Sequence, residues 1–187
     1  MLIPVFTETV VNDSFNTSEQ IDTAVRLIGT LSQTYAIDTD RLYTTGQSPD
    51  GLTSFHLNVK YPDLFAASLF VGSQRNNEIL DVLESDRFFW IVSVGDDKAS
   101  AGQSGLMAVF DHDGVPFAHA EWSAQDGAQT QEAAVQALID EGLGANFVTF
   151  TKGTTVAGGA TGSEHLTSFD DAYRLEAVRG WLFAQSK

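Results

Sequence analysis

The chain has 187 residues, enough for one domain with a single core, and 43% of them are hydrophobic. Ten Lys and Arg against 25 Asp and Glu give a formal charge of −15, and such an acidic surface excludes binding to nucleic-acid phosphates. The chain contains no cysteine, which excludes disulfides, thiolate metal sites and cysteine nucleophiles and leaves the redox compartment open.

The N-terminal stretch "MLIPVF" has no basic segment, and its apolar run is too short for a signal peptide. A cytoplasmic location is therefore the default expectation, with the compartment itself unknown. No run of about 18 apolar residues occurs, so we expect no transmembrane helix and no membrane partner. Residues 2–6 are typical of a short buried strand. Thr17 and Gln20 predict a capping box ahead of a helix whose buried face carries Ile21, Val25 and Ile28.

Strand-like and helix-like segments alternate through the rest of the chain. The unbroken apolar runs "FAASLFVG" and "RFFWIVSVG" suit strands covered on both faces, as in parallel sheets. In chain order, the predicted elements are a strand at 41–46, a helix at 51–61 that ends at Tyr61-Pro62, strands at 65–72 and 87–95, a helix at 101–111, a strand at 115–122, a helix at 128–142, a strand at 146–153 and a last helix at 168–185. This alternation predicts the α/β fold class, with a mostly parallel sheet flanked by helices, in a single domain over 1–187.

The stretch "TTGQSPDG" (44–51) leads from a predicted strand into a predicted helix. At such a point α/β-hydrolases place their nucleophilic serine, in a G-x-S-x-G turn. Here Gly51 arrives one residue late and Pro49 follows Ser48. The local sequence alone also fits a helix start, with Ser48 as N-cap, Pro49 at the first helical position and the acidic Asp50 behind it.

The stretches "AIDTDRLYTTGQS", "KYPDLFAASLFVG", "FFWIVSVGDDKASAG", "FVTFTKG" and "GSEHLTSFDDAYRLEAVRGWLFAQ" share an order along the chain with one known family. Together they resemble the serine esterases of the polyhydroxybutyrate-depolymerase and feruloyl-esterase type, within the α/β-hydrolase superfamily. The resemblance covers nearly the whole chain. It implies a shortened α/β-hydrolase fold.

The resemblance also implies a catalytic role for three residues. Ser48 matches the family's nucleophile and His165 its general base, while the acid is the aspartate after "VG", for which we favour Asp96 over Asp97. The order Ser, Asp, His along the chain is that of α/β-hydrolases. In such a triad the imidazole takes the serine proton and the carboxylate fixes the imidazole tautomer. Outside the resemblance, Asp96 is a turn aspartate and His165 a loop histidine near a helix start.

The turn departs from the family's usual G-Q-S-M-G-G at two positions. It keeps Gln47, but Pro49 replaces Met and removes the backbone N–H that normally donates to the oxyanion. Asp50 replaces Gly, and we expect its side chain to crowd the close approach of the turn to the neighbouring strand. Pro49 is also expected to favour extended angles for Ser48, whereas a nucleophile elbow is strained. Loss of one oxyanion donor costs about 2.7–4 kcal/mol, so efficient hydrolysis is in question.

The family's first strands, and the loop that supplies its other oxyanion donor, have no counterpart here. Residues 2–6 match the family's fourth strand, so the strand at 41–46 is predicted to lie at an exposed edge of the sheet. We expect either a homo-oligomer that covers this edge or an N-terminal segment that is rearranged to fill the gap.

The other histidines and the Gly-rich loop carry no predicted chemistry. His56 falls in a predicted helix, where a partly buried, hydrogen-bonded histidine is expected. His112 and His119 lack a companion at metal-ligand spacing. The loop 153–163 lacks the pattern of a phosphate-binding turn. We therefore expect no metal and no cofactor.

Two further features are expected to be structural. The stretch "GQSG" (102–105) falls inside a predicted helix start and lacks the G-x-S-x-G spacing. Phe70 and Trp122 could line an acyl or aryl pocket, but core packing is the preferred interpretation for both.

The sequence thus predicts a serine-dependent hydrolase of small-molecule carboxylic esters, namely acyl or feruloyl esters or short polyesters. The alternative is a catalytically inactive binding or scaffold protein that keeps the fold without a normal oxyanion hole. A third expectation is that the chain is a fragment or altered copy of a longer esterase.

Overall fold

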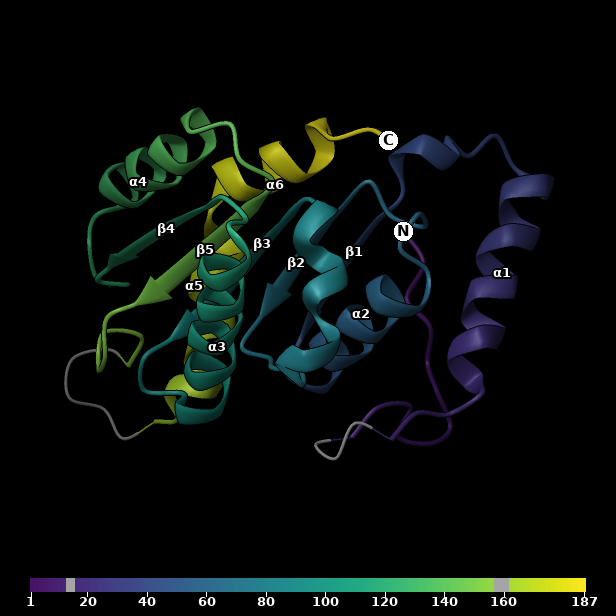
Figure 1. Cartoon of the computed structure of the whole chain (residues 1–187), viewed down its shortest axis with the longest axis horizontal. Coiled ribbons are helices and arrows are strands. Elements are labelled where there is room, and N and C mark those ends of the chain that lie inside the picture. Colours follow the sequence, from purple (N-terminus) through teal and green to yellow (C-terminus); the bar gives the residue numbers. More distant parts are fainter. Residues whose placement is uncertain (13–15, 157–161) are drawn as a thin grey trace.

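The structure is a computed structural model that describes residues 1–12, 16–156 and 162–187. Its strands form one sheet in the order β1-β2-β3-β5-β4, and every neighbouring pair is parallel (Figure 1). The strands are β1 (Tyr43–Gln47), β2 (Ala67–Val71), β3 (Phe88–Ser93), β4 (Phe117–Trp122) and β5 (Ala145–Phe150). The predicted α/β fold class is therefore confirmed.

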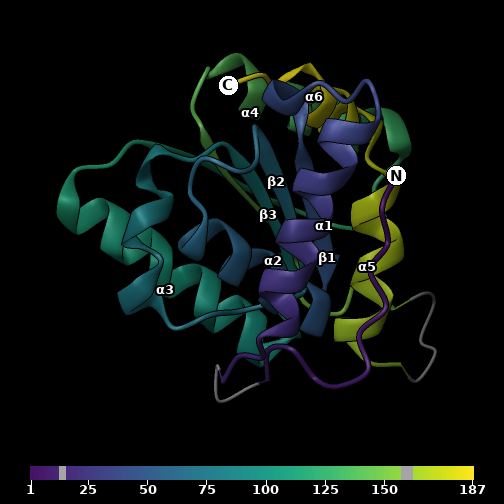
Figure 2. The ribbon, with the colours of Figure 1, turned by 90° about the vertical axis from the view of Figure 1, so that its right-hand side faces the viewer.

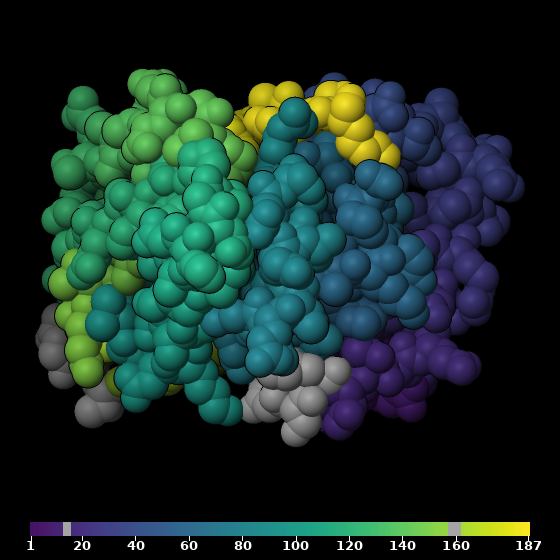
Figure 3. Space-filling model, viewed as in Figure 1, coloured from purple at the N-terminus to yellow at the C-terminus, as the bar shows by residue number. Residues whose placement is uncertain are grey.

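Helices cover both faces of this sheet (Figure 2). They are α1 (Gln20–Thr34), α2 (Pro49–Lys60), α3 (Asp97–Asp113), α4 (Ala128–Asp140), α5 (Glu164–Arg174) and α6 (Glu176–Ala184), with 3₁₀ turns η1 (Thr39–Arg41), η2 (Asn77–Ile79) and η3 (Asp81–Ser85). Helices α2 and α3 pack on one face with η2 and η3, and α4, α5 and α6 pack on the other. In the space-filling view the first of these layers hides most of the sheet (Figure 3).

The two-sided packing explains why the apolar runs in the sequence do not alternate with polar residues. Along β3, Phe88 and Trp90 point into the layer formed with α2 and α3, while Phe89 and Ile91 point into the layer formed with α4 to α6. All four side chains are fully buried. A strand that is covered on both faces needs apolar residues at successive positions.

Phe70 and Trp122 both belong to the hydrophobic clusters. Phe70 stacks on Phe55 of α2, with 3.9 Å between ring centroids, and Trp122 meets Phe150 edge to face at 6.1 Å. Their surroundings are those of core residues, as the sequence analysis expected.

The predicted strand at 2–6 is wrong, because these residues form no strand in the structure. Ile3 and Val5 are exposed, at 68% and 91%, whereas Phe6 is half-buried and packs against the cluster formed by Val10, Val11, Ile21 and Leu52. An apolar run forms a strand only where a neighbouring strand accepts its hydrogen bonds, and here none is offered.

Strand β1 lies at the edge of the sheet, as predicted, and α1 is the outermost element on that side (Figures 1 and 2). The small cluster around Ile21 and Leu52 joins α1 and the segment before it to α2. No strand of the described residues pairs with the outer side of β1, so the filling of this gap by a rearranged N-terminal segment stays a prediction. A homo-oligomer paired through β1 is a separate proposal, which light scattering of the purified chain would test.

The predicted capping box is wrong as well. Helix α1 begins at Gln20 and has no side-chain cap. The amide of Gln20 bonds instead to Thr7, accepting from its backbone N–H at 3.2 Å and donating to Oγ1 at 2.8 Å. The side chain of Gln20 thus bonds to Thr7 rather than forming a capping box with Thr17.

The last helix differs from its prediction in both its start and its continuity. It begins at Glu164 rather than at 168, and it is interrupted at Leu175, whose ψ of 103° is extended. Leu175 is buried, and the carboxylate of Glu132 on α4 accepts from the N–H groups of Glu176 and Ala177 at 2.7 and 2.8 Å. This cap supplies acceptors for the free donors of a new helix start, so the chain turns there without Pro or Gly.

Candidate active site

Ser48 lies in the turn between β1 and α2 and has strained backbone angles, with φ 53° and ψ −125°. Within the described part of the chain it is the non-glycine residue with a positive φ. The expectation that Pro49 pushes Ser48 to extended angles is therefore wrong. Both angles lie outside the extended region that proline favours for the preceding residue.

Hydrogen bonds around the Ser48 backbone hold this conformation. Its N–H donates to Val71 O on β2 at 3.1 Å, and its carbonyl accepts from the Ser73 hydroxyl at 2.7 Å and from Gly51 N–H at 3.0 Å. The Ser73 carbonyl in turn accepts from the indole N–H of Trp90 at 3.1 Å. Strain of this kind persists only where the surroundings fix it.

The glycines of the turn are needed at Gly46 and Gly51. A Cβ atom on Gly46 would lie 2.3 Å from Asp50 O, and one on Gly51 would lie 1.9 Å from Ser73 Oγ. Asp50 itself is exposed, so the expectation that its side chain crowds the neighbouring strand is wrong. Gly51, the glycine that arrives one residue late in the G-x-S-x-G pattern, occupies the close approach.

The structure brings the three proposed catalytic side chains into one line. Ser48 Oγ lies 2.8 Å from His165 Nε2, and His165 Nδ1 lies 2.5 Å from Asp96 Oδ2. Asp96 is 8% exposed and also caps α3, its Oδ1 accepting from Ala99 N–H at 3.3 Å. Asp97 is exposed on the first turn of α3, so His165 pairs with Asp96 rather than with Asp97.

The alternative interpretation of Ser48 as an ordinary N-cap does not describe its side chain. Ser48 occupies the N-cap position of α2 but makes no side-chain cap hydrogen bond. Its hydroxyl is used instead by His165, which is 117 residues away in the chain.

The imidazole of His165 is also held from the side. Phe169, one turn further along α5, meets it edge to face with 5.0 Å between ring centroids. Gly72 makes room for that phenyl ring, since a Cβ there would lie 2.5 Å from it. Neither Phe169 nor Ser73 has a role that the sequence predicts. A histidine-to-phenylalanine spacing of four residues within a helix is the signal that could have indicated the first of these contacts.

The oxyanion side of the site lacks one usual donor. Pro49 is the first residue of α2 and has no N–H, and the next backbone donor is that of Asp50. Within the described residues, neither Asp50 N–H nor the half-buried side-chain amide of Gln47 makes a hydrogen bond.

The fold resembles that of a solved esterase. The crystal structure of a thermostable esterase matches with a TM-score of 0.61 and 20% sequence identity, over 94% of this chain and 39% of that chain. The likeness shows an α/β-hydrolase-like fold, and this chain spans well under half the length of that esterase. No family model matches the chain, and the search of curated proteins gives no match.

The remaining histidines lie outside this line of residues. His56 Nδ1 is 3.3 Å from the buried guanidinium of Arg75, and burial, aided by that positive charge, lowers the pKa of His56. His119 bonds to Thr149 at 3.1 Å, and His112 is exposed in the last turn of α3. In the described ranges, no group of three or more potential ligands could hold a metal ion.

The stretch 102–105 lies inside α3, as expected. Most of the Gly-rich stretch of the loop 153–163 lies outside the described residues, which omit 157–161. None of the helices in the ranges given above is long and apolar enough to cross a bilayer.

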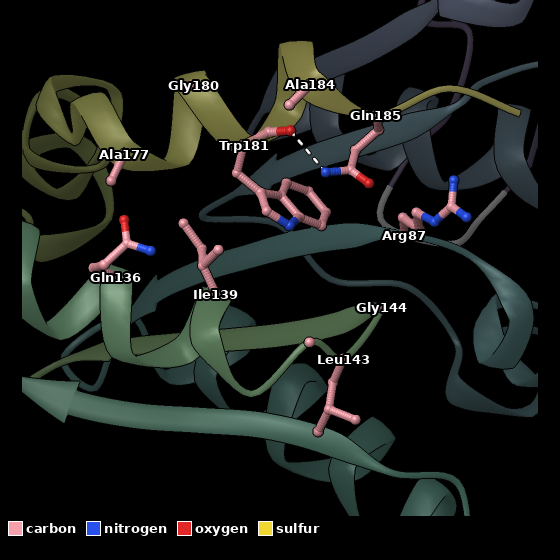
Figure 4. Close-up of a pocket in the computed structure, with 11 residues that line it drawn as sticks. Arg87, Gln136, Ile139, Leu143, Gly144, Ala177, Gly180, Trp181, Ala184 and Gln185 are labelled. Atoms are coloured by element: carbon pink, nitrogen blue, oxygen red, sulfur yellow. Dashed lines mark hydrogen bonds between the residues drawn. The ribbon is translucent and has the colours of Figure 1, made fainter.

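A hollow of about 580 Å³ is lined largely by residues of α4 and α6 (Figure 4), and none of the proposed catalytic residues lines it. Trp181 of α6 and Ile139 of α4 line it together with Arg87 and Gly144. Because Arg87 and Gly144 immediately precede β3 and β5, the hollow is at the amino end of the sheet. Asp96 follows the carboxyl end of β3, so the two sites are at opposite ends.

Proposed function

We propose that the chain hydrolyses carboxylic esters by acyl transfer through Ser48. The observation that carries the proposal is the Ser48–His165–Asp96 line, at 2.8 and 2.5 Å, with the serine on a strained turn between a strand and a helix. The likeness of fold to an esterase supports the reaction class. Ester substrates of the acyl, feruloyl or short polyester type follow from the family resemblance.

The proposed first step is attack of Ser48 Oγ on the ester carbonyl carbon, while His165 Nε2 takes the hydroxyl proton. Asp96 accepts the hydrogen bond from Nδ1–H and stabilises the imidazolium that forms. When the tetrahedral intermediate collapses, the bond to the alcohol oxygen breaks and His165 returns the proton to that oxygen. Water then attacks the acyl-enzyme with His165 again as base, and the carboxylic acid and free Ser48 are released.

Stabilisation of the oxyanion limits this proposed mechanism. With Pro49 in place, the ordinary donor after the nucleophile is missing, and removal of one such donor lowers kcat by about 10²–10³. The Asp50 N–H and the Gln47 amide are the nearest free donors along the chain, and the start of α2 adds a favourable helix dipole. We expect a slow esterase.

The second candidate is a binding protein that has lost catalysis, which Pro49 and the acidic Asp50 favour. Hydrolysis of p-nitrophenyl acetate and butyrate, measured beside Ser48→Ala, separates the two. Turnover or fluorophosphonate labelling that disappears in Ser48→Ala supports the esterase. Equal background rates and no labelling of either protein would favour the binding protein.

A further inference from the structure

Glu164, the residue before His165, is half-buried, and its carboxylate bonds to groups of the protein. Its Oε2 accepts from the hydroxyl of Ser93 at 2.7 Å and from the backbone N–H of Gly153 at 2.8 Å. Ser93 is the fully buried last residue of β3, and Gly153 follows the end of β5. One oxygen therefore ties the start of α5 to the carboxyl ends of two adjacent strands.

The backbone of the β3 end leaves room for this carboxylate. A Cβ atom on Gly95 would lie 1.8 Å from Glu164 Oε1, so only glycine admits the carboxylate there. Gly95 stands between Ser93, which binds Glu164, and Asp96, which binds His165. The consecutive residues Glu164 and His165 are thus fixed to nearly consecutive residues of the β3 end.

This double attachment restricts where the imidazole can lie. His165 must reach both Ser48 and Asp96, and a displacement of about 1 Å in a catalytic group can cost about 10²-fold in rate. The N-cap of α5 makes no side-chain hydrogen bond, so this turn is held by the Glu164 bonds on the side of β3 and by the hydroxyl of Thr167, which bonds to Thr155 at 3.1 Å. Glu164 lies in the stretch "GSEHLTSFDDAYRLEAVRGWLFAQ" and has no role that the sequence predicts.

We propose that Glu164 is a positioning residue that holds His165 at hydrogen-bonding distance from both Ser48 and Asp96. The consequence for rate rests on the proposed esterase function, whereas the consequence for the His165–Asp96 hydrogen bond does not. Ser93 and Gly153 both donate to the same oxygen of Glu164. In Glu164→Gln the amide oxygen can take its place as acceptor. Glu164→Ala removes it. Asp170→Ala, at an exposed position of α5, is the matched control.

The first measurement is the downfield proton resonance of the His165 Nδ1–H in the folded protein, followed against pH. We expect Glu164→Ala to weaken or abolish it, while Glu164→Gln and Asp170→Ala keep it. The second is the rate of fluorophosphonate labelling, expected to fall about tenfold or more in Glu164→Ala and less than about threefold in Glu164→Gln. KM for p-nitrophenyl butyrate should change little, so the loss should lie in kcat.

An unchanged resonance in folded Glu164→Ala overturns the proposal, whatever the labelling rate. If Glu164→Ala does not fold, Ser93→Ala takes its place, because it removes one of the two donors and leaves the carboxylate. A weakened resonance in Ser93→Ala supports the proposal and an unchanged one overturns it. If wild-type Ser48 is not labelled, the esterase proposal fails, but the resonance comparison still decides the role of Glu164.

Discussion

The candidate site has two halves that differ in completeness. In the acid–base half, consisting of Ser48, His165 and Asp96, each side chain has its hydrogen-bond partner. In the oxyanion half, at the start of α2, Pro49 lacks an N–H and the exposed Asp50 adds negative charge where a negative charge would develop. The geometry for proton transfer can therefore exist without the usual donor for the oxyanion, and substitutions can address each half separately.

The largest expected effect tests the acid–base half. Asp96→Asn should lower the rate of fluorophosphonate labelling about 10⁴-fold, because an amide favours the wrong imidazole tautomer. Asparagine can still cap α3, so the fold should be kept. Asp97→Asn, one residue along, is the control and should stay within about twofold. Equal losses in the two variants would remove Asp96 from its proposed role.

A gain of activity is expected on the oxyanion half. Pro49→Ala restores an N–H after the nucleophile and should raise kcat about 10²–10³-fold, the usual value of one donor. Pro62→Ala, at the exposed turn after α2, is the matched control and should change nothing. If Pro49→Ala leaves kcat as it was, another donor already serves the oxyanion.

A smaller effect tests whether the strained turn depends on its glycines. Gly46→Ala places a methyl group against the Asp50 backbone and should lower the free energy of unfolding by about 1–3 kcal/mol or more. Gly29→Ala, in an open position on α1, should instead raise it by about 0.5–1 kcal/mol. Urea denaturation compares the two. Equal destabilisation would mean that the turn tolerates a side chain at Gly46.

The smallest expected effect concerns Asp86, which unlike Asp96 lies outside the candidate site. It is a change in how stability depends on pH. Asp86 Oδ2 has no partner among the described residues, and burial, with the nearby Asp63 charge, raises the pKa of Asp86 from 3.8 to about 6. The folded protein thus holds this proton more tightly than the unfolded chain, and the free energy of unfolding should fall as pH rises from about 4 to about 6.

Asp86→Asn should remove that fall. Allowing for the partial exposure of Asp86, the difference is about 1–2 kcal/mol, measured by urea denaturation at about pH 4 and pH 7. Asp81→Asn, at an exposed position nearby, is the control. A variant with the wild-type pH dependence would contradict the assignment to Asp86.

The parts of the fold that the sequence predicts well are those decided by local pattern. The apolar run at 87–95 predicts β3 because both faces of that strand are buried, and Tyr61-Pro62 predicts the end of α2 because proline restricts its neighbour. Ser48, Asp96 and His165 come after β1, β3 and β5, and this suffices to place all three at the carboxyl edge of a parallel sheet.

The parts that it predicts poorly depend on partners far away in the chain. Residues 2–6 look like a strand but have no neighbouring strand to pair with. The break at Leu175 depends on Glu132, which is 44 residues from the helix start that it caps. The bond between Glu164 and Ser93 spans 71 residues. A local pattern carries no information about such partners.

The contact between Ser48 and His165 joins residues 117 positions apart. The nucleophile is in place once β1, β2 and α2 have assembled, but its base arrives only with α5, near the end of the chain. Small local openings that detach α5 would separate the two side chains while most of the sheet stays intact. The nucleophile therefore reports on the docking of the C-terminal helices, and its reactivity should be lost before the sheet unfolds.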